Sequence, residues 1–570
     1  MNKKWIFLPD DGEKRVREFA ATLNVHHAIA SILIQRNIDD FEKAKAFFRP
    51  SLENLFDPFL MKDMDVAVER LCMAISSKQK ILVYGDYDVD GTSAVALVYS
   101  FLRKFHSAIE FYIPDRYKEG YGISDQGIQF AIDSGIKLVI CLDCGIRSVE
   151  LIEKARNNGV DFIVCDHHKP GSTLPPAVAV LDPKREDCGY PYDELTGCGV
   201  GFKLLQGFCI RNKIDHEKLF AYLDLLAISI AADIVPITGE NRILTFHGIK
   251  LLESKPRPGL RALLKASGIS GKISVMDLVF GIGPRVNAAG RIHHARDSVN
   301  LLISDSMDSS MKLAETLNAH NSKRKEFDSS ITEEALAMIE ESDRLLNAKS
   351  TVLFKPDWHK GVIGIVASRC IERYYRPTII LTQSEGTATG SARSVEGFDI
   401  HEAINNCSDL LMKFGGHTHA AGLTMHLDNV QSFVQRFESE VSSTITIEQL
   451  TQKIIIDHYL PLDELNSNLY KILRQIGPFG PGNMLPVFYC DDVVCTGTPR
   501  ILKDKHLKMF VKQQNGKRKW EAIGFNLSEH FNEISSGQPF LMAYSLDENQ
   551  YMGQTFLQVT IKDIKFGPVK

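Results

Sequence analysis

The sequence predicts an α/β protein of several domains, with a parallel-sheet domain, a long connecting helix, a smaller α/β domain and a C-terminal β-barrel. Three observations indicate this fold class. Short apolar runs alternate with helical segments between residues 81 and 181, residues 306–345 contain no Pro or Gly, and short apolar runs separated by turn residues fill residues 452–570. Because 570 residues are too many for one hydrophobic core, three or four domains are expected.

The first α/β domain is predicted from its alternating pattern. Strands are expected at residues 81–84, 109–113, 137–142, 161–165 and 177–181, and helices at 91–105, 125–134 and 148–158. Strands that alternate with helices through short loops imply a parallel sheet. From about residue 197 to 300 the pattern becomes mainly helical.

The rest of the chain divides into a linker and two further domains. The linker keeps an apolar stripe, typical of one or two long helices that bridge domains, through Leu313, Leu317, Ile331, Leu336 and Ile339. A second α/β unit is expected from about residue 350, with strands TVLF and PTIILT and helices from Gly361 and Asp399. The last segment has the pattern of a small all-β barrel. The expected boundaries are 1–65 (N-terminal extension), 66–305, 306–345, 346–450 and 451–570.

Bulk composition is that of an ordinary water-soluble protein, with 44% hydrophobic residues and a formal net charge of −5. No apolar stretch reaches the roughly 18 residues of a membrane span, and the start MNKKWIFLPDDGEK is a poor signal peptide. A cytoplasmic location is therefore expected. The chain is also expected to be a monomer. Cys141 and Cys144 form a CxxC, but a zinc site would need a second pair and only Cys165 is near, so buried thiols are favoured.

Acidic and histidine side chains gather where apolar runs end. They are Asp86, Asp88 and Asp90 in ILVYGDYDVDGTSA, Asp143 in ICLDCGI, Asp166, His167 and His168 in IVCDHHKP, and Asp233 in ISIAADIVP. One such Asp is usually a turn or cap residue, but the carboxyl ends of parallel strands meet at one edge. Crowded carboxylates with imidazole suit one or two Mn²⁺ or Mg²⁺ ions, the usual apparatus for phosphoester hydrolysis.

These residues resemble the four motifs of the DHH phosphoesterase superfamily. The segment FGGHTHAAG (414–422) is similar to the GGHxxAAG signature of the DHHA1 domain. Together with TGCGVGFKL (196–204), GPRVNAAGRI (283–292), SARS (391–394) and IGPFGPGN (476–483), the ordered set resembles the RecJ family of single-stranded-DNA-specific 5′→3′ exonucleases over about residues 70–570. The resemblance implies a parallel-sheet DHH catalytic domain, a long helix, a smaller α/β DHHA1 domain and a C-terminal OB-like β-barrel.

The resemblance also implies roles for the strand-end residues. Two divalent cations, Mn²⁺ or Mg²⁺, would be bound by Asp88, Asp90, Asp143, His167 and Asp233, with Asp143 bridging. Related pyrophosphatases have a histidine ligand where this chain has Tyr84, and Asp86 is expected to fill that place. Among the catalytic residues, His168 would lie near the scissile phosphate, Asp166 would orient a histidine, and His417 would reach a phosphate near the metals.

Arginine and serine in glycine-rich segments suit phosphate binding. The candidates are Arg116 in IPDRYKEGYG, Arg285, Asn287 and Arg291 in PRVNAAGR, and Ser391 and Arg393 in the small-residue loop expected at GSARS. Taken singly, each arginine is more often a surface residue. The resemblance favours Arg116, Ser391 and Arg393 as a pocket for a 5′-phosphate.

A basic hairpin is expected at ILKDKHLKMFVKQQNGKRKW, which carries seven Lys or Arg and one Asp around Asn515-Gly516. Phe510 and Trp520 would stack on bases. The candidate DNA-binding residues are Lys512, Lys517, Arg518, Lys519 and Trp520. A solvated hairpin with its aromatic side chains in the core is the alternative.

The expected function is a metal-dependent exonuclease that releases 5′-mononucleotides from single-stranded DNA in recombination and repair. Single-stranded-DNA-binding protein and a helicase are expected partners. No association with a membrane is expected. One alternative is a DHH-superfamily phosphodiesterase acting on short oligonucleotides or cyclic dinucleotides. The other is a catalytically silent DNA-binding protein that kept the fold.

Overall fold

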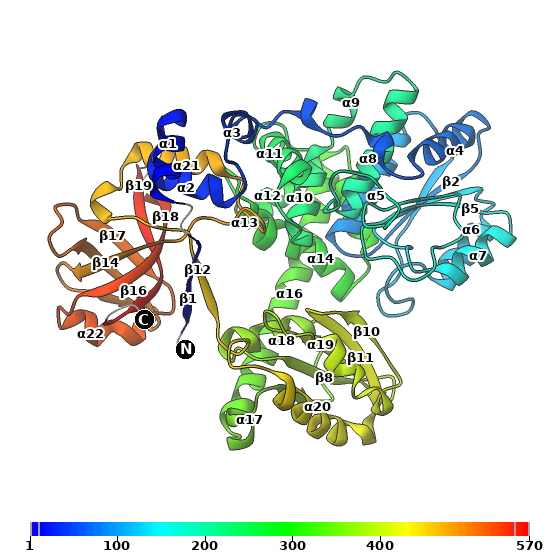
Figure 1. Cartoon of the computed structure of the whole chain (residues 1–570). Coiled ribbons are helices and arrows are strands. Elements are labelled where there is room, and N and C mark those ends of the chain that lie inside the picture. Colours follow the sequence, from blue (N-terminus) through cyan, green and yellow to red (C-terminus); the bar gives the residue numbers. More distant parts are fainter. Residues whose placement is uncertain (1–2, 10–11, 552–553, 568–570) are drawn as a thin grey trace. The chain divides into compact units, whose positions relative to one another are not determined.

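The computed structural model describes residues 3–9, 12–551 and 554–567 and separates into two compact units (Figure 1). Unit 1 draws on Met1–Leu55, Pro236–Phe246 and Lys453–Lys570. Unit 2 comprises Phe56–Val235 and His247–Gln452.

The first sheet of unit 2 is parallel throughout, as predicted, with strand order β3-β2-β4-β5-β6. Its register pairs Gly85 with Leu142 and Leu142 with Cys165, so the residues that follow three strands meet at one edge. The strands are β2 (Ile81–Gly85), β3 (Ile109–Tyr112), β4 (Leu138–Leu142), β5 (Asp161–Cys165) and β6 (Ala179–Leu181). The helices of this region are α4 (Met64–Ser76), α5 (Val89–Leu102), α6 (Asp125–Asp133), α7 (Val149–Asn157) and α8 (Gly197–Arg211).

A helical region follows and ends in a long helix, α16 (Met307–Glu340). This helix buries Leu317, Ile331 and Ile339 of the predicted stripe, whereas Leu313 and Leu336 are half-buried. No helix among the described residues combines the length and apolar character needed to cross a membrane. The other helices here are α9 (Glu217–Phe220), α10 (Leu223–Asp233), α11 (Gly239–Ser254), α12 (Pro258–Ser267), α13 (Val275–Asp277), the π-helix η3 (Leu278–Ile282), α14 (Gly283–Ile292), α15 (Arg296–Leu302) and α17 (Asp343–Asn347).

The second sheet of unit 2 is mixed, with order β10-β11-β9-β8-β7, and its β7–β8 pair is parallel. The predicted loop at GSARS is wrong, because residues 387–393 form a strand in which small side chains alternate between buried and half-buried positions. His417 also ends a strand, β10. The elements are β7 (Thr351–Phe354), α18 (Ile363–Arg373), β8 (Thr378–Ser384), β9 (Thr387–Arg393), α19 (Ile400–Asn405), β10 (Lys413–His417), β11 (Ala420–His426) and α20 (Val430–Thr444).

Unit 1 contains the predicted β-barrel. Its strand order is β13-β14-β18-β19-β17-β16-β15, and a further pairing of β14 with β16 closes five of these strands into a barrel. The elements are β13 (His458–Tyr459), η6 (Leu462–Glu464), α21 (Ser467–Ile476), β14 (Phe488–Cys495), β15 (Arg500–Leu502), β16 (His506–Gln513), β17 (Trp520–Gly524), α22 (Phe531–Ser535), β18 (Phe540–Tyr551) and β19 (Gln554–Lys565).

The N-terminal residues share the core of that barrel. Strand β1 (Lys4–Phe7) pairs in parallel with β12 (Lys453–Ile456). Helices α1 (Glu13–Leu23), α2 (His27–Gln35) and α3 (Phe41–Phe48) contribute apolar side chains to the same cluster as the barrel strands. Arg242, from the segment 236–246, donates to the carbonyls of Phe47, Ile476 and Gly477. The compact units therefore join the first 55 residues to the barrel.

Candidate metal centre and phosphate pocket

The end of β2 and the start of α5 hold three aspartates in one tight turn. Asp86 follows the strand and is fully buried, and Asp88 caps the helix by accepting a hydrogen bond from the Gly91 N–H at 3.0 Å. Asp90 lies in the first helical turn. A Cβ atom at Gly91 would lie 2.4 Å from the Asp86 carbonyl oxygen, so this turn requires glycine.

Asp143 and His167 follow β4 and β5 and meet the other carboxylates. Nε2 of His167 lies 3.2 Å from Oδ1 of Asp143, 3.6 Å from Oδ2 of Asp233 and 3.8 Å from Oδ2 of Asp90. Asp143 has a left-handed backbone with φ 59°, and Asp233 ends α10. Residues from three strand ends and one helix end thus face one point.

The potential ligand atoms form overlapping groups. Asp86, Asp88 and Asp143 make one group, and Asp90, His167 and Asp233 make another, with the ligand atoms of each group within 4.8 Å of one another. Asp143 also groups with His167 and His168. Asp143 therefore belongs to two of these groups.

The electrostatics of the cluster favour cations. Burial, followed by the charges of Asp90, Asp88 and Asp233, raises the pKa of Asp143 well above its ordinary value. Burial and the charge of Asp88 likewise raise the pKa of Asp86. Burial lowers the pKa of His167 to about 4, so its imidazole is neutral. Oδ2 of Asp86 and both ring nitrogens of His167 are buried without a hydrogen-bond partner among the described residues. Buried carboxylate oxygens and imidazole nitrogens that lack a hydrogen-bond partner are suited to bind divalent cations.

Helix α8 orients Asp90. Its Oδ2 accepts from the Gly197 N–H at 2.7 Å, and its Oδ1 accepts from the Cys198 N–H at 2.9 Å and from Oγ of Ser229 at 2.6 Å. Sequence reasoning missed Ser229, which lies within an apolar run. The close approach of α8 to the site did have a signal in the sequence, the first glycine of TGCGVG. A Cβ atom at this residue, Gly197, would lie 2.6 Å from the Asp143 Cα.

His168 is held beside this cluster by Asp166. Nδ1 of His168 lies 2.8 Å from Oδ1 of Asp166, and its Nε2 lies 3.3 Å from the hydroxyl of Tyr121. Burial acts to lower the pKa of His168, but the hydrogen bond and charge of Asp166 outweigh it and raise the pKa to about 9. The Tyr121 hydroxyl also lies 3.3 Å from the Asp143 carbonyl oxygen, a contact that the sequence did not indicate.

A cavity of about 240 Å³ brings together arginines from three segments. Arg116 follows β3, Arg291 ends α14, and Ser391 and Arg393 lie on β9. Burial, then the charges of Arg116 and Arg393, lowers the pKa of Arg291 to about 9. Three mutually repelling guanidinium groups favour an anion.

The cavity wall is continuous with the metal cluster through Tyr87. This residue lies between Asp86 and Asp88, lines the cavity and stacks under the Arg116 guanidinium, whose carbon is 4.8 Å from the ring centroid. Tyr87, Tyr117 and Gly361 were not predicted as site residues. The Tyr117 hydroxyl donates to the Arg291 carbonyl, and Arg291 donates to the Gly361 carbonyl.

Three predicted residues lie outside this lining. Arg285 donates to Oδ1 of Asn318 at 2.9 Å and to the carbonyls of Gly281 and Ala266, and thereby ties α14 to neighbouring helices. Asn287 is half-buried on α14. His417 ends β10 and is largely exposed. Partial desolvation of its ring, followed by the charges of His419, Arg393 and His168, lowers its pKa.

The basic hairpin is present in unit 1. Strands β16 and β17 pair from Leu507 to Val511, and the connecting loop is held by Asp463, which accepts from the N–H groups of Lys517 and Arg518. Lys517, Arg518 and Lys519 are exposed and Lys512 is half-buried. Trp520 donates from Nε1 to the Leu462 carbonyl and packs on the barrel core.

The CxxC thiols are buried. Sγ of Cys141 lies 3.3 Å from Sγ of Cys144, and the hydrogen bond from Cys141 and burial raise the pKa of Cys144. Among the described residues, no group of three potential metal ligands contains a cysteine.

Comparison with known proteins assigns the chain to a family. Family models match at residues 80–230 (DHH family, N-terminal domain), 347–443 (DHHA1 domain) and 456–563 (RecJ OB domain). The single-stranded-DNA-specific exonuclease RecJ of Bacillus subtilis is 34% identical over 564 residues, which cover 98% of this chain and 70% of that protein. The chain belongs to the RecJ family. RecJ of Escherichia coli is 35% identical over 523 residues, covering 88% of this chain and 90% of that protein.

A RecJ structure also matches the whole fold. The crystal structure of RecJ in complex with Mn²⁺ from Thermus thermophilus superposes with a TM-score of 0.85 at 26% identity, covering 99% of this chain and 80% of that chain. The expected fold class is therefore confirmed, with DHH, DHHA1 and OB domains in the order that the RecJ resemblance implied.

Proposed function

We propose that this chain hydrolyses single-stranded DNA from the 5′ end and releases 5′-mononucleotides, using two divalent cations, Mn²⁺ or Mg²⁺. The observation that carries this proposal is the set of overlapping ligand groups, two of which contain Asp143, beside a cavity lined by three arginines. Relatives that bear the name single-stranded-DNA-specific exonuclease, and a RecJ structure with Mn²⁺, support it.

The metal ligands follow from the two groups. Asp86, Asp88 and Asp143 would hold one cation, and Asp90, His167 and Asp233 the other. Oδ1 of Asp143 lies 3.2 Å from Nε2 of His167, so Asp143 is close to the second set as well. When bound, divalent cations would supply charge neutralisation at the scissile phosphate and activation of a water at neutral pH. Neutral His167 is already in the ligand form.

His168 would act on the phosphate and not on a metal. Asp166 fixes its Nδ1, so the other ring nitrogen is free of that bond and lies beside the Tyr121 hydroxyl. A protonated His168 donates a hydrogen bond to a phosphate oxygen as negative charge accumulates. His417, at the end of β10, would contact a phosphate of the bound strand.

The arginine pocket would set the direction and the product. A 5′-phosphate held by Arg116, Arg291, Arg393 and Ser391 fixes the terminal nucleotide. Because Tyr87 joins this pocket to Asp86 and Asp88, the first linkage of the strand lies toward the metal cluster. Cleavage there releases one nucleotide with its 5′-phosphate.

The barrel would hold the rest of the strand. Lys512, Lys517, Arg518 and Lys519 supply positive charge for the backbone. Trp520 is engaged with the barrel by its Nε1 and its packing, whereas Phe510 is 52% exposed and offers a stacking face. A cytoplasmic role in recombination and repair, with single-stranded-DNA-binding protein and a helicase as partners, follows from this proposal.

The test is digestion of a long single strand labelled at either end, with Mn²⁺, Mg²⁺ or EDTA, beside its blunt duplex. We expect metal-dependent release of mononucleotides from the 5′ end of the single strand only. Strands with a 5′-phosphate should be preferred over strands with a 5′-hydroxyl, and Arg393→Gln should remove that preference. Cleavage of dinucleotides but not of long strands would instead favour a small-substrate phosphodiesterase, and no cleavage at all a DNA-binding protein.

A further inference from the structure

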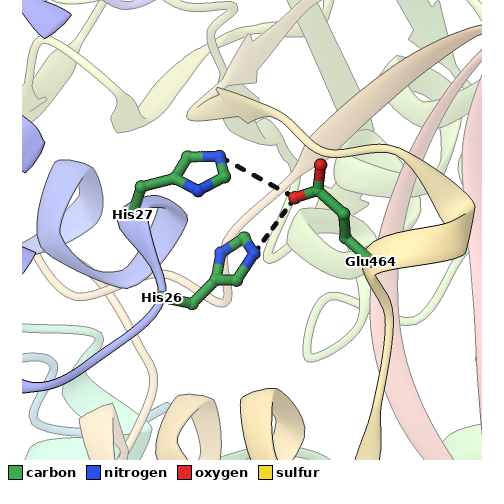
Figure 2. Close-up of side chains that lie close together, drawn as sticks. All are labelled: His26, His27 and Glu464. Atoms are coloured by element: carbon green, nitrogen blue, oxygen red, sulfur yellow. Dashed lines mark ion pairs between the residues drawn. The ribbon is translucent and has the colours of Figure 1, made fainter.

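Two consecutive histidines of unit 1 face a glutamate from the barrel end of the chain. His26 and His27 lie at the start of α2, and Glu464 ends η6 (Figure 2). Nε2 of His26 is 3.0 Å from Oε2 of Glu464, and Nε2 of His27 is 3.9 Å from the same oxygen. The two imidazole rings lie with their centroids 4.2 Å apart.

Local structure explains why neighbouring residues can point to one place. Consecutive residues inside a helix do not share a face, but His26 is the N-cap residue and has an extended backbone, with φ −64° and ψ 144°. Its ring therefore turns back over the first helical turn toward the ring of His27. The one-turn helix η6 then presents Glu464 to both rings.

The Glu464 oxygen that faces both rings lacks a hydrogen-bond partner among the described residues. Oε2 of Glu464 is buried, and among the described residues it has no hydrogen-bond partner, although Nε2 of His26 is only 3.0 Å away. The imidazole N–H is thus not directed at the oxygen. The two imidazole rings and this oxygen are close enough to bind one cation together, and the cation would be the partner that the buried oxygen lacks.

The distances match a transition-metal site. Zn–N and Zn–O bonds of about 2.0–2.1 Å in a tetrahedron place ligand atoms ~3.3 Å apart, between the 3.0 Å and 3.9 Å separations observed here. Burial, then His27, lowers the pKa of His26, and the opposing effect of Glu464 is smaller. A neutral imidazole is the form that binds a metal. Imidazole with one carboxylate favours Zn²⁺ and its neighbours over Mg²⁺.

The site has access to solvent. His27 lines a cavity of about 800 Å³ together with Asp457, His458 and Tyr459. The His458 ring centroid is 5.2 Å from that of His27. A metal held by three protein ligands would therefore have room for water in its fourth position.

One hydrogen bond opposes metal binding, and its energetic effect is small. Nδ1 of His26 accepts a hydrogen bond from the Ala28 N–H at 3.2 Å. A metal on Nε2 would place the ring proton on Nδ1, so this capping bond would be exchanged for a metal–nitrogen bond. The capping bond is long, and a metal–nitrogen bond is much stronger.

We propose that His26, His27 and Glu464 form a binding site for Zn²⁺ or a similar late transition-metal ion, separate from the carboxylate-rich centre of unit 2. The metal links α2 to η6, and so joins the N-terminal helices to the barrel segment of unit 1. Its chemistry differs from that of the unit 2 centre, which has five aspartates and one histidine.

The test measures, by equilibrium dialysis, how many Zn²⁺ ions bind to each full-length chain when Mn²⁺ is present in excess. The variants are Glu464→Gln, which keeps the side-chain volume, and a double variant, His26→Asn with His27→Gln, in which Asn preserves the N-cap. The control is His530→Gln, which removes a histidine 3.9 Å from Glu529 without a third ligand. Exonuclease activity with Mn²⁺ and circular dichroism report that each variant is folded.

We expect the unmodified chain and His530→Gln to bind one more Zn²⁺ than Glu464→Gln and the double variant, or to bind it at least ten-fold more tightly. Zn²⁺ should also raise the thermal midpoint only where the three ligands are intact. Equal Zn²⁺ binding by all four proteins would overturn the proposal and leave an ordinary His–Glu contact. If the variants do not fold, anomalous scattering at the zinc edge from crystals of the unmodified protein decides, since a missing peak beside Glu464 refutes the site.

Discussion

Asp143 stabilises the site only when cations are bound. Burial and four neighbouring carboxylates raise its pKa in the folded protein, above the unfolded value of about 3.9. A raised pKa means that the contribution of this group to stability is complete below the unfolded pKa and is lost as the pH rises. Asp143→Asn should therefore reduce nuclease activity about 10³-fold or more and yet stabilise the metal-free protein at pH 7.

The stability part of this prediction is measured by denaturant unfolding in EDTA. The Asn variant should be more stable than the unmodified protein, because it carries no charge to bury beside the other carboxylates. The difference should shrink toward pH 4 and reverse when Mn²⁺ is added. Asp305→Asn, at a side chain that is 89% exposed, is the control and should change neither quantity. Equal stability of Asp143→Asn and the parent at pH 7 in EDTA contradicts the electrostatic account.

At the scale of an element, the start of α8 is shaped by its approach to the metal centre. Alanine is a better helix former than glycine by about 1 kcal/mol, so propensity alone favours Gly197→Ala. The new Cβ would lie 2.5 Å from Cβ and 2.6 Å from Cα of Asp143, and overpacking of this kind costs about 1–3 kcal/mol. We expect the clash to prevail, with Mn²⁺ affinity and activity falling together.

Isothermal titration with Mn²⁺ measures this effect. The matched control is Gly189→Ala, at an exposed glycine where a Cβ would meet nothing within 4 Å. The control should bind Mn²⁺ as the parent does. Unchanged Mn²⁺ affinity in Gly197→Ala would show that α8 does not position Asp90 and Asp143.

The elements differ in how far the sequence could predict them. Strand-end aspartates were predictable, because a parallel register brings the ends of β2, β4 and β5 to one edge. Ser229 was not, because its bond to Asp90 crosses 139 residues and its run is uniformly apolar. Strand β9 was missed because TATGSAR has small side chains on both faces, so its period of two carries almost no hydrophobic contrast.

At the scale of the whole molecule, the sequence predicted the types of domain better than it predicted which segments pack together. The barrel was visible from its short strands and turns. No motif in the sequence of the N-terminal helices indicates a function, and their amphipathic pattern does not tell which core they cover. Their partner is found only in the packing, where Ile29, Ile32 and Leu33 join the barrel cluster with Phe488 and Tyr544.

The N-terminal helices should therefore be required for the stability of the barrel and not of unit 2. Leu33→Ala removes a fully buried side chain of that shared cluster, which should cost about 2–5 kcal/mol. Amide hydrogen exchange should show faster exchange in β14 and β18 and unchanged protection in α5. The control is Ile447→Ala, at a residue that is 83% exposed, which should alter stability by less than about 0.5 kcal/mol. Unchanged exchange in the barrel strands of Leu33→Ala would show that the first 55 residues are an appendage that the barrel does not need.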